Sequence, residues 1–188
     1  MHEVLLNLKY QKLNKLFKFF KQCYRLQLSQ TKKELAVWKD IKKFFNSTGF
    51  NVGVHEKKKY VELHFRTEEK ATLSFYVQTN EEFLTYNATI ISPYPQGITE
   101  DLFILSAHFN NLFRYGTVIV DVNAKEVEYV VKIDLHNILL HPEKIELFFQ
   151  MHYNSSEDVL HAFNRLIQEG EAPAIIIADL LKERENRS

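Results

Sequence analysis

The chain has 188 residues, of which 45% are hydrophobic, and its 15 Phe and 9 Tyr supply enough apolar material for a packed core, so wholesale disorder is excluded. The length fits one domain with an appendage. The 24 basic and 24 acidic side chains balance, but residues 1–33 hold eight Lys or Arg against one acid, so this segment carries +7 and the remainder −7.

The first segment, residues 3–26, has the periodicity of an amphipathic helix. Its apolar residues recur at alternating spacings of four and three, and its basic residues in the second half fall on the opposite side. A helix with such an apolar stripe needs a cover: the rest of the protein, a second copy, a partner or a membrane surface. The candidate partner-binding residues on this helix are Leu6, Tyr10, Leu13, Phe17, Phe20, Tyr24, Lys18, Lys21 and Arg25.

The basic charge of this arm permits several partners. Basic arms bind nucleic acid or anionic lipid, but an arm so rich in apolar side chains also suits the acidic body of its own or a neighbouring chain. Nucleic-acid binding requires exposed aromatic residues among the basic ones, and the aromatic residues here follow helical spacing. We therefore expect a protein partner, with the body or a second copy favoured, and no nucleic acid.

Lysines at every third position from Lys9 to Lys21 interrupt the apolar residues of the N-terminal segment. No stretch approaches the roughly 18 apolar residues that a membrane-spanning helix needs, and a cleavable signal peptide is excluded for the same reason. The single cysteine, Cys23, cannot form an intramolecular disulfide, which is typical of a reducing compartment. We expect a soluble, cytoplasmic protein.

A second helix follows, with Thr31 as its N-cap and Glu34 completing a capping box. It ends at Gly49, because glycine adopts the left-handed C-cap conformation without steric cost. Its predicted buried side chains are Leu35, Trp38, Ile41, Phe44 and Phe45.

From Phe50 the hydrophobic period changes to two. Apolar and polar residues alternate over residues 61–66, 72–78 and 84–90, with short polar turns at residues 56–58, 67–69 and 80–81. This alternation is typical of antiparallel strands that cover a core on one face.

Pro93, Pro95 and Gly97 end this meander. A third helix is predicted from about Glu100 to Tyr115, capped by Thr99 and closed by Gly116. Two strands, 118–122 and 127–135, flank a turn at 123–124. A fourth helix begins at Pro142 and ends at Gly170, with a kink or break expected at 154–156, and a last helix begins at Pro173. This order predicts an α+β fold: an antiparallel sheet of five to six strands flanked by helices, with an extra N-terminal amphipathic helix.

The eight histidines and the paired acids do not form a recognisable catalytic or metal-binding motif. His136 and His141 lie in a loop, and His152 and His161 are nine residues apart on a helix, so that they face opposite ways. There is no His-Glu-x-x-His motif and no cysteine pair. We expect the acids near the last two strands to be solvated, and we assign no catalytic, cofactor or metal residues. These acids are Asp121, Glu126, Glu128 and Asp134.

The segment from residue 105 to 135 resembles the YbjN family, which shares the fold of type III secretion chaperones. The residues that carry the resemblance are Asn110-Asn111-Leu112-Phe113-Arg114-Tyr115-Gly116, the strand Val118-Ile119-Val120-Asp121 and the hairpin into 127–135. The resemblance covers residues 31–165. It implies a helix-flanked antiparallel sheet, often dimeric, that binds other polypeptides. Asn110, Asn111 and Arg114 match the family pattern, with a structural role in capping the third helix and positioning the next strand.

These observations predict a basic amphipathic helix at residues 1–28 and a YbjN-like domain at residues 29–188. The N-terminal helix and the tail after Gly170 depart from the family pattern. We expect a bacterial, non-enzymatic, chaperone-like or regulatory protein-binding module that forms a homodimer. The alternative is a peripheral membrane protein that binds anionic lipid through Lys18, Lys21 and Arg25.

Overall fold

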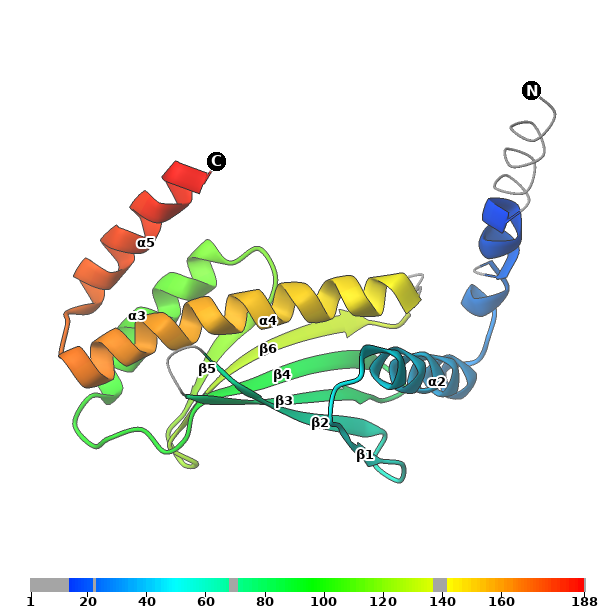
Figure 1. The fold of residues 1–188 in the computed structure, drawn as a ribbon, viewed down its shortest axis with the longest axis horizontal. Helices are drawn as coiled ribbons and strands as arrows, with labels where there is room; N and C mark the ends of the chain where they lie inside the picture. Colours follow the sequence, from blue (N-terminus) through cyan, green and yellow to red (C-terminus); the bar gives the residue numbers. More distant parts are fainter. Residues whose placement is uncertain (1–13, 22, 68–70, 137–141, 188) are drawn as a thin grey trace.

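The computed structural model describes residues 14–187 except residues 22, 68–70 and 137–141. The described chain folds as a sheet with helices packed on it, preceded by a helical N-terminal segment at 14–21 and 23–26 (Figure 1). The elements are α2 (Gln30–Thr48), β1 (Gly53–His55), β2 (Tyr60–Arg66), β3 (Thr72–Thr79), β4 (Phe83–Ile91), α3 (Thr99–Leu112), β5 (Thr117–Asp121), β6 (Glu126–Asp134), α4 (Pro142–Asn164), a π-helical turn (Arg165–Glu169) and α5 (Pro173–Arg187).

The six strands form one antiparallel sheet in the order β1-β2-β3-β4-β6-β5. The α+β class, the antiparallel sheet and the strand number are therefore confirmed. Period-two alternation has the expected result, because the apolar positions of β2, β3 and β4, apart from the half-buried Phe65, are buried and the polar positions between them are not. The three-residue edge strand β1, whose residues are all exposed, carries no such alternation.

The helices cover the apolar face of the sheet, with α4 lying along it and α2 beside the start of α4 (Figure 1). Two polar contacts join α4 to the central strands: the Tyr86 hydroxyl donates to the Ile145 carbonyl at 3.0 Å, and His152 Nε2 lies 3.0 Å from the Tyr129 carbonyl. Because both pairs are buried and hydrogen-bonded, they fix the position of α4 without leaving those groups unsatisfied.

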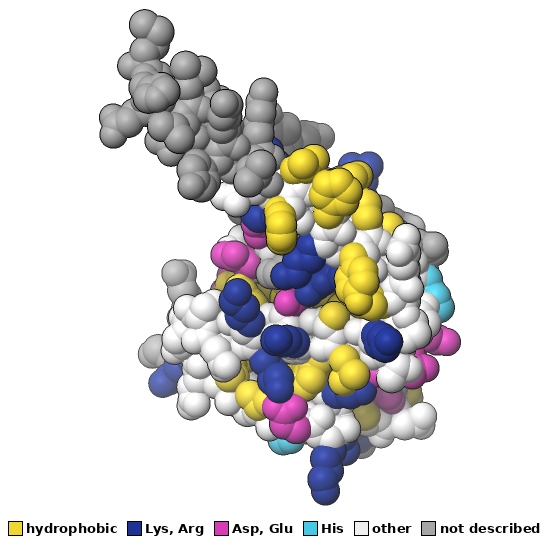
Figure 2. All heavy atoms as spheres, turned by 90° about the vertical axis from the view of Figure 1, so that its right-hand side faces the viewer, with side chains coloured by type: hydrophobic (Ala, Val, Ile, Leu, Met, Phe, Trp, Pro, Cys, Tyr) yellow, Lys and Arg dark blue, Asp and Glu magenta, His cyan; other side chains and the backbone are white. Residues whose placement is uncertain are grey.

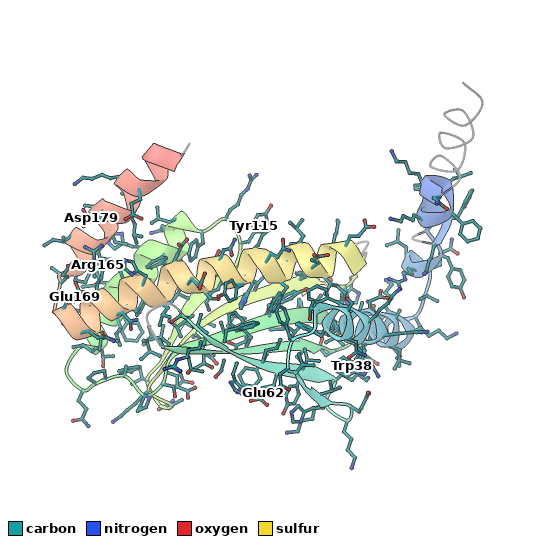
Figure 3. All side chains as sticks on the ribbon, viewed as in Figure 1. Trp38, Glu62, Tyr115, Arg165, Glu169 and Asp179 are labelled. Carbon is teal, nitrogen blue, oxygen red and sulfur yellow. The ribbon has the colours of Figure 1, made fainter. Side chains whose placement is uncertain are left out.

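Helix α5 is joined to the end of α4 by ion pairs. The Arg165 guanidinium contacts Asp179 at 2.8 Å and also contacts Glu171. Figure 3 shows Arg165 and Asp179 on neighbouring elements at this end of the molecule. The predicted start of this helix at Pro173 is confirmed, and Gly170 ends the preceding helical turn in the left-handed conformation.

The start of α2 differs from the prediction. Its N-cap is Ser29 rather than Thr31. The Thr31 hydroxyl donates to Glu81, and the Glu34 carboxylate pairs with Lys59 at 2.7 Å, so the proposed capping box is wrong: tertiary partners take both side chains. Gly49 is the left-handed C-cap as predicted.

The buried side of α2 also differs in part. Leu35, predicted to be buried, is 52% exposed, whereas Val37 is buried. The stripe that faces the sheet centres on Trp38, Ile41 and Phe45, and Leu35 lies on its flank.

The later helices differ from the prediction at three points, the first of which is the N-cap of α3, where Ile98 stands rather than Thr99. Helix α3 ends at Leu112, three residues before the predicted end. Helix α4 continues through 154–156 without a break. The Ser156 hydroxyl donates to the carbonyl of His152 at 2.7 Å, so the helix accommodates this serine by bonding it to its own backbone.

Asn110 joins α3 to β5. Its side-chain oxygen accepts the backbone N–H of Val118 at 2.7 Å, and its amide donates to the Val118 carbonyl at 3.0 Å. The predicted role of Asn110 in positioning the next strand is therefore confirmed. The following loop ends at Gly116, whose φ is +83°, and a Cβ there would meet the Tyr129 ring at 2.6 Å.

We expect the Asn110→Ala variant to lose about 1–3 kcal/mol of unfolding free energy, because it leaves both backbone groups of Val118 without their partner. The Asn111→Ala variant, changed at an exposed position next to it, should stay within about 0.5 kcal/mol of the wild type. Urea denaturation followed by circular dichroism measures both. Equal midpoints for the two variants would contradict the role assigned to Asn110.

Candidate functional site

The N-terminal helix presents large apolar side chains to solvent. Phe17 is 76% exposed, Tyr24 is 65% exposed and Phe20 is 61% exposed, and Leu16 and Phe19 are exposed beside them. We call these five side chains the apolar face of the N-terminal helix. Figure 2 looks at the end of the molecule from which this helix projects and shows hydrophobic and basic side chains side by side there.

The basic side of the same helix contacts the body of the protein. Arg25 pairs with Asp40 on α2 at 2.6 Å, and Lys18 pairs with Glu143 at the start of α4. Because these residues lie opposite the apolar stripe, the ion pairs turn the apolar face away from the body. The expectation that the basic arm lies against acidic groups of its own chain is thus met at two points.

The two ion pairs differ in strength. Lys18 and Glu143 are well exposed, and such surface pairs contribute little. The side chains of Arg25 and Asp40 are only 20% and 12% exposed. Removing one partner of a largely buried pair leaves a charge uncompensated, so of the two ion pairs the Arg25–Asp40 pair contributes more to the orientation of the helix.

The structure thus places six of the nine predicted partner-binding residues. Phe17, Phe20 and Tyr24 are exposed together, Lys18 and Arg25 are paired with the body, and Lys21 is exposed. The remaining three, Leu6, Tyr10 and Leu13, lie outside the described residues.

A second apolar feature lies between α2, β2 and α4. It is a cavity of about 520 Å³, which we call the aromatic pocket. Its rings meet edge to face: the centroids of Phe50 and Phe65 are 5.2 Å apart at 90°, and those of Phe44 and Phe149 are 5.8 Å apart at 61°. Its lining residues are Phe44, Thr48, Phe50, Phe65, Glu146, Phe149, Gln150, Tyr153 and Asn154.

The sequence did not reveal this pocket. In the sequence, Phe44 and Phe149 have the spacing of ordinary core positions of two helices, and Phe50 falls in the connection after the first of them. The rings come together only when α2 and α4 pack side by side. A local excess of aromatic residues at helix ends was the one available signal.

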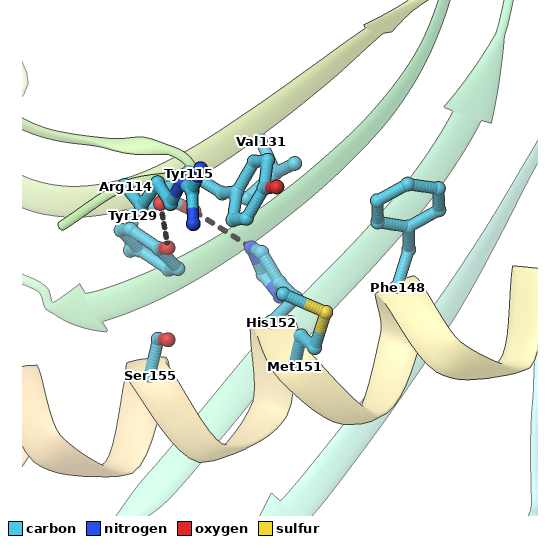
Figure 4. Close-up of a pocket in the computed structure, with 8 residues that line it drawn as sticks. All are labelled: Arg114, Tyr115, Tyr129, Val131, Phe148, Met151, His152 and Ser155. Carbon is cyan, nitrogen blue, oxygen red and sulfur yellow. Dashed lines mark hydrogen bonds between the residues drawn. The ribbon is translucent and has the colours of Figure 1, made fainter. Parts of the chain in front are cut away.

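A smaller pocket of about 90 Å³ lies between β6 and α4 (Figure 4). His152 is its most buried polar group. The His152 ring stacks on Tyr129 with centroids 5.0 Å apart, and its Nδ1 has no hydrogen-bond partner among the described residues. The Tyr129 hydroxyl donates to the Tyr115 carbonyl at 2.6 Å. The pocket has room for a few water molecules only, and we assign it a structural role.

Burial shifts the pKa values of His152 and Tyr129 in this pocket. It lowers the pKa of His152 to about 4, against the opposing effect of hydrogen bonds to backbone groups of Tyr129 and Tyr86. Burial likewise raises the pKa of Tyr129, and a hydrogen bond with Ser155 opposes that shift. Both side chains are therefore neutral at pH 7.

The remaining histidines and acids have ordinary structural surroundings. His152 is buried and His161 is exposed, so the prediction that they face opposite ways is confirmed; His141 is not among the described residues. Asp121 accepts hydrogen bonds from the turn that follows it, and Glu128 accepts one from Asn87. Within the described ranges, no three His, Cys, Asp or Glu side chains are grouped to hold a metal ion.

Of the helices that the structure describes, none combines the length and apolarity needed to span a bilayer.

Comparisons with known proteins identify the fold. No family model matches the chain, and no curated protein matches its sequence. Among solved structures, YbjN from E. coli, a candidate transcription regulator, superposes with a TM-score of 0.54 at 11% identity, over 69% of this chain and 93% of that one. A chain of the ExsC–ExsE complex superposes with a TM-score of 0.50 at 16% identity, over 68% of this chain and 93% of that chain. The chain therefore has a YbjN-like, secretion-chaperone-like fold.

His152 makes the stability of the protein depend on pH. The unfolded histidine binds a proton near pH 6.5 and the folded one only near pH 4. Between these values the unfolded state therefore binds more protons than the folded state. The stability that depends on neutral His152 is fully present above pH 6.5 and is lost as the pH falls to about 4. The loss is roughly 3 kcal/mol. We expect His152→Gln, which keeps a donor near the Tyr129 carbonyl, to remove this part of the acid destabilisation in denaturant titrations.

His161→Gln, on the exposed side of the same helix, is the matched control and should retain the wild-type fall between pH 7 and 4. If His152→Gln and wild type lose equal stability over that range, His152 is not the cause.

Proposed function

We propose that the chain is a non-enzymatic, chaperone-like protein-binding module that associates with a second copy through its N-terminal helix. In this proposal residues 1–28 are the contact segment and residues 29–188 the chaperone-like body, and the protein acts in a bacterial cytoplasm. The observation that carries the proposal is the orientation of the helix: its charged side is tethered to the body, and Phe17, Phe20 and Tyr24 face solvent.

The size of the apolar face supports an interaction role. An aromatic side chain buries about 150–250 Å² when covered, so the five side chains, each more than half exposed, present on the order of 600 Å² together. A continuous apolar patch of this size reaches the upper end of what a monomeric protein exposes. Covering it twice in a symmetric dimer gives an interface of the usual size for a specific complex.

The fold comparison supports protein binding in general terms. One structural neighbour was solved as a complex with another protein, and the other is a candidate regulator. Neither name describes catalysis, and in the described part of this chain the pocket that holds a buried titratable histidine has space for only a few water molecules.

The anionic-lipid alternative fits the geometry less well. A helix that lies in a membrane interface needs its basic residues beside an apolar face that enters the lipid. Here Lys18 and Arg25 are paired with Glu143 and Asp40 on the side that faces the body. Of the three basic residues assigned to lipid, Lys21 is the one with no ion pair given by the structure, which leaves little charge for the headgroups.

Self-association through the apolar face predicts that Phe17→Ser/Phe20→Ser is monomeric in light scattering at concentrations where the wild type is dimeric. Substitution is preferable to deletion of residues 1–28, because deletion would leave Asp40 without Arg25. The matched control is Phe103→Ser/Ile104→Ser on α3, two apolar side chains that are also exposed, at 47% and 42%, and it should leave the dimer intact.

A wild type that is monomeric throughout would end the homodimer proposal. In that case salt-sensitive sedimentation with vesicles containing anionic lipid, lost in the Lys21→Ser variant, would favour the lipid alternative.

A further inference from the structure

Two apolar surfaces of this chain stay open within one copy: the apolar face of the N-terminal helix and the aromatic pocket. We propose that the pocket is the receptor for the helix of a second copy, so that two chains exchange their N-terminal helices. This inference rests on the proposed self-association and names the surface that receives it.

The pocket is built to accept aromatic side chains. At about 520 Å³ it falls in the range of pockets that bind ligands. Phe50 is 41% exposed at its mouth, and its ring meets Phe65 edge to face. A further ring can pack on these edges in the same offset geometry, which adds to the gain from burial alone.

The helix of the same copy does not fill the pocket. The lining residues come from α2, β2, α4 and the connection after α2, and Phe17 and Phe20 remain exposed. The helix joins the N-terminal end of α2, whereas Phe44 lies 14 residues further along, or about 21 Å at the rise of an α-helix. Arg25 is meanwhile held by Asp40. The apolar face is thus held away from the pocket of its own chain and open to that of another.

Charge complements the apolar match. Glu146 lines the pocket, and its lining residues among those that the structure describes include no Lys or Arg. Lys21, which the periodicity placed opposite the apolar stripe, follows Phe17 by four residues and lies beside it at the border of the apolar face. In the exchanged arrangement this lysine therefore enters with the Phe17 ring and meets the Glu146 carboxylate. The arm and the body also attract each other at long range, because residues 1–33 carry a charge of +7 and the remaining residues carry −7. Opposite charges on arm and body steer the arm of one copy to the body of another.

Exchange also closes the assembly. If each copy both gives a helix and receives one, the two contacts are related by a two-fold axis and no surface is left for a third chain. Two helices that pair only with each other leave both aromatic pockets empty.

Mixing two full-length variants separates these arrangements. The helix variant, Phe17→Ser/Phe20→Ser, keeps an intact pocket. The pocket variant, Phe50→Ser, keeps an intact helix, and Glu146→Lys on the exposed rim serves as a second pocket variant that leaves the aromatic packing untouched. Analytical ultracentrifugation of each variant alone and of equimolar mixtures, with one partner fluorescently labelled, measures the association, and circular dichroism confirms folding.

We expect each variant alone to dimerise at least about tenfold more weakly than the wild type, and the mixture to form a heterodimer through one intact helix and one intact pocket. Charge reversal gives a second test. We expect Lys21→Glu to weaken the dimer and a mixture of Lys21→Glu with Glu146→Lys to restore dimer formation.

If both pocket variants dimerise as the wild type does, while the helix variant is monomeric, the helices pair with each other and the pocket inference is overturned; the proposed function survives. If the mixture of the helix variant and the pocket variant forms no heterodimer, the pocket inference is likewise overturned and the proposed function survives. A monomeric wild type overturns both.

Discussion

The structure depends on covering one face of a six-stranded antiparallel sheet. Alternation along β2, β3 and β4 puts most of their apolar side chains on that face, and an uncovered apolar face of this size is unstable in water. Helix α4 supplies the central cover, and it is fixed by Tyr86 and His152: the Tyr86 hydroxyl and the His152 Nε2 atom bond to backbone carbonyls inside the apolar layer. Burial raises the pKa of Tyr86 and lowers that of His152, so both act as neutral groups there.

The position of α4 determines where the aromatic pocket forms. Phe149 sits between the ring of Phe45 on α2 and that of Phe75 on β3, and these contacts bring the end of α2 against α4. Where the two helices separate, the rings of Phe44 and Phe50 are left at an open edge. The pocket is thus a consequence of core packing, which explains why rings that a helix pattern assigns to the core also line a surface feature.

Much of the fold follows from local patterns, because burial of one face imposes a period on each element. The strands β2 to β6 were predictable in this way, and the C-cap at Gly49 and the helix starts at Pro142 and Pro173 followed from residue type. The role of Asn110 was expected from the resemblance to the YbjN family. The start of α2 was not, since Ser29 and Thr31 are both good caps and the choice depends on Lys59 and Glu81, which are distant in sequence. Exposure of Leu35 likewise depends on how α2 is rotated against the sheet. The apolar stripe of the N-terminal helix was evident, but not which face would meet the body.

That orientation is the most informative property of the N-terminal helix. An amphipathic helix that served only its own domain would turn its apolar side inward, because burying an aromatic side chain stabilises by about 1.5–3 kcal/mol whereas a surface ion pair contributes less than about 1 kcal/mol. Here Arg25 and Asp40 hold the opposite side inward, although desolvating such a pair is itself unfavourable. The exposed apolar side is the surface that the proposed second copy would cover. In the proposed dimer, the +7 charge of the arm and the −7 charge of the body favour a second copy of the same protein as the partner, and the aromatic pocket is the surface proposed to receive its helix.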